Sequence, residues 1–101
     1  MKFKLIDLIE LWRGEGIYES LEHIETSNWE DDGKYSYCDV IFKYDSKIYL
    51  WTITRSGSYF TDYYYDWEDI DSSKRKETYI ESTEVERVEV IKYEWRKIKN
   101  Q

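Results

Sequence analysis

Apolar residues recur at helical spacing close to the N-terminus. Asp7 and Glu10 lie on the opposite side of this pattern, and Gly14 follows where a helix commonly ends in a left-handed residue. The pattern predicts an amphipathic helix over Lys4–Arg13, with an apolar face made of Leu5, Ile6, Leu8, Ile9 and Trp12.

The next segment, Ile17–Glu25, fits two structures. A helix would place Ile17, Leu21 and Ile24 on one side and glutamates on the other, and we favour this interpretation. A short strand is the alternative, because the segment leads into a hairpin-like region.

Two strands joined by a tight turn follow. Tyr35–Tyr44 and Lys47–Thr54 are rich in β-branched and aromatic residues, and Asp45-Ser46 between them predicts a two-residue hairpin connection. Glu30–Gly33, just before them, predicts a turn in which glycine supplies a positive φ. Both faces of the second strand are largely apolar, so we expect it to be central and covered on each side.

The C-terminal half is punctuated by polar segments. Arg55–Ser58 predicts a break in the strand, Lys76–Ser82 a short strand, and Val85–Ile98 the last strand, with a phase shift that a β-bulge would accommodate. We expect a single α+β domain, residues 1–101, with one or two N-terminal helices packed on an antiparallel sheet of four or five strands.

Composition agrees with a folded domain that has an acidic surface. The chain has 101 residues, of which 41% are hydrophobic and 19% aromatic, with four Gly and no Pro. These values exclude collagen-like and linker sequences and argue against disorder. The net charge is −7, and residues 15–45 alone hold nine acids and two cations. Because nucleic-acid binding depends on neutralising phosphates with Lys and Arg, we expect no direct binding to DNA or RNA.

The single cysteine and the hydropathy pattern favour a cytoplasmic protein of a bacterial host cell. Cys38 cannot form an intrachain disulfide and is expected to be a small packing residue. The apolar stretch Leu5–Trp12 is interrupted by Asp7 and Glu10, so we expect no secretory signal, and no run is long enough to cross a membrane. Residues with AT-rich codons predominate, which indicates a low-GC bacterium or its phage.

No motif supports catalysis, a cofactor or a metal. The only histidine, His23, lies in an acidic stretch, and no Gly-x-Ser-x-Gly motif is present. An EF-hand loop starting at Asp66 or Asp69 fails at the required positions, and one Cys with one His cannot form a structural zinc site. We therefore expect a protein that is not an enzyme, without cofactor or metal.

A turn over Arg55–Ser58 offers a weak anion site. Its guanidinium, hydroxyl groups and backbone N–H groups near glycine could surround a phosphate. A strand-ending turn with a structural glycine is the interpretation that we favour. The residues of this possible anion site are Arg55, Ser56, Gly57 and Ser58.

The most unusual segment is Tyr59–Asp71, in which tyrosine and tryptophan alternate with carboxylates. Such rings are favoured at protein interfaces, and carboxylates could meet Arg and Lys of a partner. Some of the rings are expected to fill the core. The predicted partner-binding residues are Glu30, Asp31, Asp32, Asp62, Tyr63, Tyr65, Asp66, Trp67, Glu68, Asp69 and Asp71.

In size, AT-rich composition, acidity and Tyr/Trp density, the chain resembles small phage- or prophage-encoded proteins, among them anti-restriction and anti-CRISPR proteins. The resemblance lies in overall character and implies a DNA mimic that inhibits a host defence or nucleic-acid-processing protein by occupying its basic surface. Two alternatives stay open. The chain could bind a nucleotide or nucleotide-derived signal, or it could be a structural or assembly protein of a phage particle.

Overall fold

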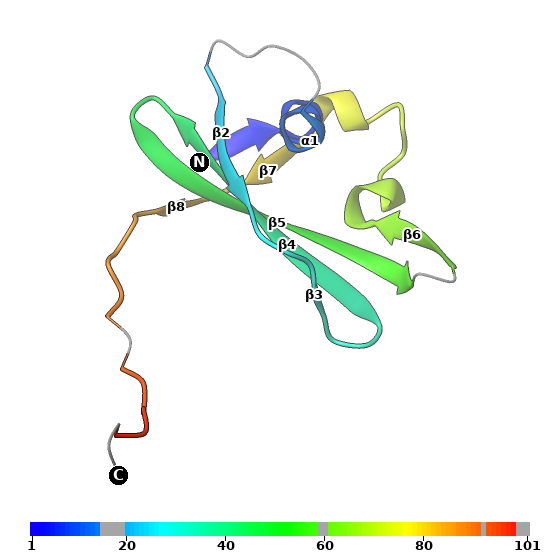
Figure 1. The fold of residues 1–101 in the computed structure, drawn as a ribbon. Helices are drawn as coiled ribbons and strands as arrows, with labels where there is room; N and C mark the ends of the chain where they lie inside the picture. Colours follow the sequence, from blue (N-terminus) through cyan, green and yellow to red (C-terminus); the bar gives the residue numbers. More distant parts are fainter. Residues whose placement is uncertain (15–19, 59–60, 92, 99–101) are drawn as a thin grey trace.

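The computed structural model describes residues 1–14, 20–58, 61–91 and 93–98 (Figure 1). Their main feature is a six-stranded antiparallel sheet, in which the order β2-β4-β5-β6 is extended by β3 on β4 and by β8 on β5. A second sheet of two strands and one α-helix pack beside it. The α+β class is confirmed, but the main sheet has six strands rather than four or five, and the described residues hold a single α-helix.

The N-terminal helix α1 spans Leu5–Arg13 and confirms the predicted helix. It ends at Gly14, whose φ of 72° lies in the left-handed region and whose N–H donates to the carbonyl of Leu11. Before it, Lys2–Lys4 forms β1, which pairs with β7, Tyr79–Glu81, near the other end of the chain. The sequence pattern did not predict β1, because three residues are too few to show a period.

Residues Glu22–Thr26 form a strand, β2, so the helix favoured for Ile17–Glu25 is wrong over this part. The strand pairs with β4, and its register shifts between His23 and Glu25. This bulge breaks the alternation that identifies a strand in a sequence. Residues 17–19 lie outside the described residues.

The central hairpin has the predicted form. Strand β4, Tyr35–Tyr44, pairs along its whole length with β5, Lys47–Ser58. Asp45 and Ser46 join them with φ values of 49° and 67°, as a type I′ turn requires. A short strand β3, Glu30–Asp31, precedes the turn at Gly33 and pairs with the start of β4.

The expected break after Thr54 is absent, because β5 continues to Ser58. Its last residues pair with β6, Thr61–Tyr65, and Gly57 lies at the register shift between the two strands. The sequence predicts a break because the apolar alternation of the strand ends after Thr54. Pairing with β4 on one side and β6 on the other nevertheless keeps the backbone of β5 extended. The bulge at Gly57 takes up the irregularity.

After β6 the chain forms two short 3-10 helices, η1 (Asp66–Asp69) and η2 (Arg75–Glu77), and then returns to the sheets. The expected short strand over Lys76–Ser82 corresponds to η2 and β7. The last strand, β8, covers only Thr83–Val85, so the long strand expected over Val85–Ile98 is wrong. Val85 lies opposite Ile48, next to the first residue of β5, and a longer β8 would run past its partner.

The core lies between α1 and one face of the sheet. Alternate residues of β4 and β5 point toward the helix and are buried, among them Val40, Phe42 and Ile53. Cys38 is 2% exposed in this core, as expected for a packing residue, and burial raises the pKa of its thiol to about 11. Residues of the other parity, such as Ile41 and Leu50, are only half-buried on the face that α1 does not cover. Coverage on each side of β5, as expected from the sequence, therefore applies only to the helix side.

Candidate functional site

The strand registers bring two distant acidic segments to the same end of the sheet. Asp31 of β3 lies opposite Ser36 of β4, which lies opposite Arg55 of β5, which in turn lies opposite Tyr65 of β6. The row crosses three inter-strand spacings, about 14 Å in all. We call this region the acidic end; its exposed residues are Glu30, Asp31, Asp32, Tyr35, Asp62, Tyr63, Tyr64 and Asp69.

The turn carboxylates of the acidic end are held by local hydrogen bonds. Asp31 accepts the backbone N–H of Gly33 at 2.7 Å, and Asp32 accepts that of Tyr35 at 3.0 Å. The second oxygen of Asp32 accepts the hydroxyl of Tyr37 at 3.2 Å, and partial burial together with this carboxylate raises the pKa of Tyr37. These bonds leave lone pairs available, since two carboxylate oxygens offer about four acceptor sites.

The β6 side of the acidic end combines exposed rings with carboxylates. Tyr64 donates its hydroxyl to Asp69 of η1 at 3.0 Å, and this hydrogen bond raises the pKa of Tyr64. Tyr63 and Tyr64 are 38% and 46% exposed. Tyr35 and Tyr64 both lie opposite Ser56, so their rings flank it on one face.

Two of the predicted partner-binding rings belong to the packing of the core instead: Trp67 is buried, and Tyr65 is half-buried against it. Trp67 is 5% exposed, and Tyr65 stacks on it with ring centroids 4.8 Å apart and planes 2° apart. Trp12 of α1 contacts both rings edge-on, and Trp51 contacts Trp67. This aromatic cluster joins α1, β5, β6 and η1. Core packing therefore uses Tyr65 and Trp67.

Arg55 is held between two rings. Its guanidinium carbon lies 3.7 Å from the ring centroid of Trp29 and 3.6 Å from that of Tyr63. Its buried Nε has no hydrogen-bond partner among the described residues. Such stacking favours a delocalised cation over a compact one.

The residues proposed as an anion site lie within a paired strand. Arg55 pairs with Ser36 and Tyr65, Ser56 pairs with Tyr35 and Tyr64, and Ser58 pairs with Thr61. Gly57 has a φ of 104°, and a Cβ there would lie 2.6 Å from the carbonyl oxygen of Asp62. The glycine thus permits a close strand contact, and residues 55–58 do not form the exposed turn on which the anion prediction depended.

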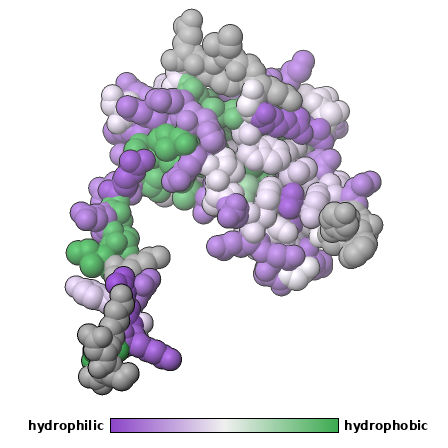
Figure 2. Space-filling model, viewed as in Figure 1, coloured by the Kyte–Doolittle hydropathy of each residue, from purple (hydrophilic) through white to green (hydrophobic). Residues whose placement is uncertain are grey.

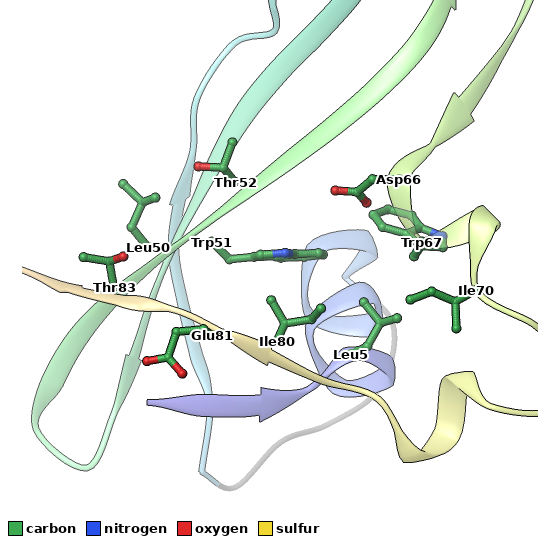
Figure 3. A pocket seen from close by; sticks show the side chains of 10 residues that line it. All are labelled: Leu5, Leu50, Trp51, Thr52, Asp66, Trp67, Ile70, Ile80, Glu81 and Thr83. Carbon is green, nitrogen blue, oxygen red and sulfur yellow. The ribbon is translucent and has the colours of Figure 1, made fainter.

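Asp66, the first residue of η1, borders a pocket of about 420 Å³ between β5, η1 and β7 (Figure 3). Its side chain is directed toward β5 and accepts the backbone N–H groups of Thr54 and Trp67. Burial of part of the carboxyl nevertheless raises the pKa of Asp66. Trp51 and Trp67 also line the pocket, together with Leu5, Ile70, Ile80, Glu81 and both threonines of the neighbouring strands, Thr52 and Thr83.

The remaining predicted acids serve local turns. Glu68 accepts the backbone N–H of Tyr65 at 2.6 Å and so begins η1. Asp71 accepts the backbone N–H and the hydroxyl of Ser73, and these bonds lower the pKa of Asp71. The acidic end thus unites Glu30, Asp31, Asp32, Asp62, Tyr63 and Asp69, while Asp66, Glu68 and Asp71 have structural partners of their own.

Neither a metal centre nor a membrane span is found in the parts of the chain that the structure describes. No group of three or more His, Cys, Asp or Glu side chains there could hold a metal ion. No described helix is long and apolar enough to cross a membrane. His23 is exposed and its Nε2 lies 2.7 Å from the hydroxyl of Thr26.

Three site residues were not predicted from the sequence: Trp29, Tyr35 and Tyr64. Trp29 precedes β3 and stacks on Arg55, while the two tyrosines belong to the exposed rings. Strand alternation could have indicated Tyr64: successive side chains of a strand point to opposite faces, so a tyrosine next to the inward-facing Tyr65 is expected to point outward.

A protein-family model described as "Phage T4 Y04K protein" matches residues 1–98 of the chain. Neither a curated protein nor a solved structure matches it.

Proposed function

We propose that this chain, which belongs to the Phage T4 Y04K protein family, acts as a non-enzymatic inhibitor that binds the basic nucleic-acid-binding surface of a host protein through its acidic end. The single observation that supports the proposal is the register of the main sheet. It places the carboxylates of β3 and its turn at the same end as those of β6 and η1. Glu30 and Asp62, which are far apart in the sequence, thereby lie at one end of the sheet.

The physical properties of the acidic end suit a partner rich in Arg and Lys. Its width of about 14 Å equals about four base-pair steps of DNA, at about 3.4 Å per step along the helix axis. Local hydrogen bonds hold Asp31, Asp32 and Asp69 in place before any partner arrives, so less side-chain entropy is lost on binding. The exposed ring of Tyr64 offers a flat surface on which a guanidinium of the partner can stack, whereas the ring of Tyr63 already stacks on Arg55.

The net charge of −7 would speed association with a basic surface and would repel nucleic acid itself. Binding by this mechanism weakens as salt screens the charges. Duplex DNA should compete for the same surface of the partner. These two properties distinguish the proposed inhibitor from a protein that is acidic only for solubility.

Affinity capture from a host lysate tests the proposal. The tagged full chain should retain a nucleic-acid-binding protein at low salt and release it on addition of duplex DNA or of high salt. The double variant Glu30→Gln/Asp62→Asn should lose most of this capture. The control Glu22→Gln/Asp45→Asn removes the same charge away from the acidic end, where Glu22 lies opposite Lys43 and Asp45 forms the hairpin turn.

Two results would overturn the proposal. One is that no nucleic-acid-binding protein is retained at low salt. The other is that the two double variants lose capture equally, because net charge and not the acidic end would then govern binding. Residues 55–58 belong to β5 and do not form the exposed turn that a nucleotide phosphate would need.

A further inference from the structure

The C-terminal arm, residues 86–91 and 93–98, is the most exposed apolar segment that the structure describes. It leaves β8 and extends away from the sheet (Figure 1). The radius of gyration of the chain is 18.0 Å, against about 13 Å for a compact domain of this length. The apolar side chains of the arm are 65% to 103% exposed; they are Val88, Val90, Ile91, Tyr93, Trp95 and Ile98.

Such an arm is unusual for a monomer in water. Single exposed apolar residues are common, but contiguous ones mark an interaction site. The arm is also rich in β-branched and aromatic residues, which favour an extended conformation against another surface. Its chemistry therefore requires a complementary apolar surface.

A complementary surface is present on the sheet face that α1 does not cover. There β2, β4, β5 and β8 form an apolar groove of about 250 Å³. Its apolar residues are half-buried: Ile24, Ile41, Ile48, Leu50 and Val85. Glu86 and Arg87 line the same groove, so the arm begins at its edge. Figure 2 shows apolar atoms both along the arm and on the body where the arm departs.

The direction of β8 carries the arm away from the groove of its own chain. Thr83 lies opposite Leu50 and Val85 opposite Ile48, so the chain runs toward the hairpin turn and passes the end of the sheet. An arm from a second copy can approach the same groove from outside. Two copies related by a two-fold axis could then each donate one arm and accept one.

Charge also favours a second copy. Residues 1–85 hold nineteen acids and ten cations, whereas residues 86–101 hold three acids and five cations. Glu25 of β2 is exposed and lines the groove, where it can face cations of an incoming arm, and Glu22, also exposed, lies three residues before it on the same strand. We propose that the C-terminal arm of each copy occupies the apolar groove of a second copy, which gives a symmetric dimer by arm exchange. This proposal goes beyond the inhibitor function and does not depend on it.

The mass of the full chain in solution tests the proposal. Light scattering at micromolar concentration should give a dimer of twice the 12.5 kDa chain mass. The arm variant Ile91→Asp/Trp95→Asp should be monomeric and still folded by circular dichroism, because these side chains are 72% and 103% exposed in the single chain. The control Tyr79→Asp changes an exposed ring of β7, 54% exposed, and should stay dimeric.

A mixing experiment tests whether the arm binds in trans. The groove variant Ile41→Lys keeps an intact arm, and the arm variant keeps an intact groove. Each should be monomeric alone, and their mixture should form a 1:1 complex through the one intact arm and groove. Should Ile41→Lys fail to fold, acrylamide quenching gives the second measurement. The difference between the unmodified chain and Trp95→Phe isolates the signal of Trp95 from that of the other four tryptophans, and shielding of Trp95 in a dimer supports the proposal.

Three results would overturn it. The unmodified chain could be a monomer with Trp95 open to quencher. It could be a monomer with Trp95 shielded, which would place the arm in its own groove. Finally, a dimer could persist in Ile91→Asp/Trp95→Asp, which would place the interface elsewhere.

Discussion

The carboxylate of Asp66 accepts the backbone N–H of Thr54 and so takes the place of a neighbouring strand. On this side β5 pairs with β8 at Ile48–Leu50 and with β6 at residues 55, 56 and 58. Thr54 lies in the stretch between these two pairings. A side chain from η1 thus satisfies a backbone donor that the sheet itself leaves unpaired.

Removal of this acceptor should destabilise the protein. Asp66→Ala leaves the half-buried Thr54 N–H without its partner, and we expect a loss of about 0.5–1.5 kcal/mol in the free energy of unfolding, the usual net value of one hydrogen bond. Asp66→Asn keeps a carbonyl oxygen and should lose less. Urea titration of both variants measures the difference. Equal losses would contradict the assigned role, because the hydrogen bond would then contribute nothing beyond the volume of the side chain.

Gly57 should tolerate a side chain less well than Gly33. Both have a φ of 104°, but a Cβ at Gly57 would lie 2.6 Å from the carbonyl oxygen of Asp62, whereas nothing lies within 4 Å at Gly33. Gly33→Ala therefore introduces backbone strain only, about 1–3 kcal/mol, and Gly57→Ala adds a clash of about 1–3 kcal/mol. Thermal unfolding of the two variants gives the comparison. If Gly33→Ala were the less stable of the two, the close contact between β5 and β6 would be wrong.

Arg55 should not be replaceable by lysine. Its planar guanidinium stacks between Trp29 and Tyr63, and an ammonium group cannot stack in this way. We expect Arg55→Lys to lower the free energy of unfolding by about 1–2 kcal/mol. Lys34→Met is the control, because Lys34 lies 5.4 Å from the ring centroid of Tyr35 in an exposed pair and should change stability by less than about 0.5 kcal/mol. If Arg55→Lys were as stable as the unmodified chain, stacking of the guanidinium between the two rings would not contribute to the free energy of unfolding.

Glu81 should contribute to stability only above the acid range. Its Oε1 lies 2.7 Å from the N-terminal ammonium group of Met1, and this hydrogen bond lowers the pKa of Glu81 below its ordinary value of 4.5. A lowered pKa in the folded state means that the contribution is complete above pH 4.5 and is lost as the pH falls through the folded value.

The variant Glu81→Gln should therefore be less stable than the unmodified chain at pH 7 and equally stable at pH 2. Chemical denaturation at both values measures this difference. Glu84→Gln, in the exposed part of β8, is the matched control for loss of one carboxylate. A difference between Glu81→Gln and the unmodified chain that is the same at both pH values would exclude the ion pair as its cause.

Local patterns in the sequence determined the parts of the fold whose interactions are local. The helix α1 has an uninterrupted apolar face, and Gly14 ends it with a left-handed residue. The hairpin of β4 and β5 follows from two alternating segments and two residues with positive φ, Asp45 and Ser46. In both cases the residues that stabilise the element lie within a few positions of each other.

Tertiary structure decided everything that depends on a distant partner. Pairing with β4 makes Glu22–Thr26 a strand although its own pattern suits a helix. The end of β5 limits β8 to three residues although the sequence continues to favour a strand. Burial likewise separates the rings: Trp67 packs in the core and Tyr64 stays outside, although both lie in one aromatic and acidic segment.

The same division applies to the candidate site. The sequence identified the acidic and aromatic residues, because charge and ring content can be counted without a structure. Only the register of β3, β4, β5 and β6 could show that Glu30–Asp32 and Asp62–Tyr64 share one end of the sheet. The physical reason is that hydrogen bonds between strands, unlike those within a helix, join residues at any separation along the chain.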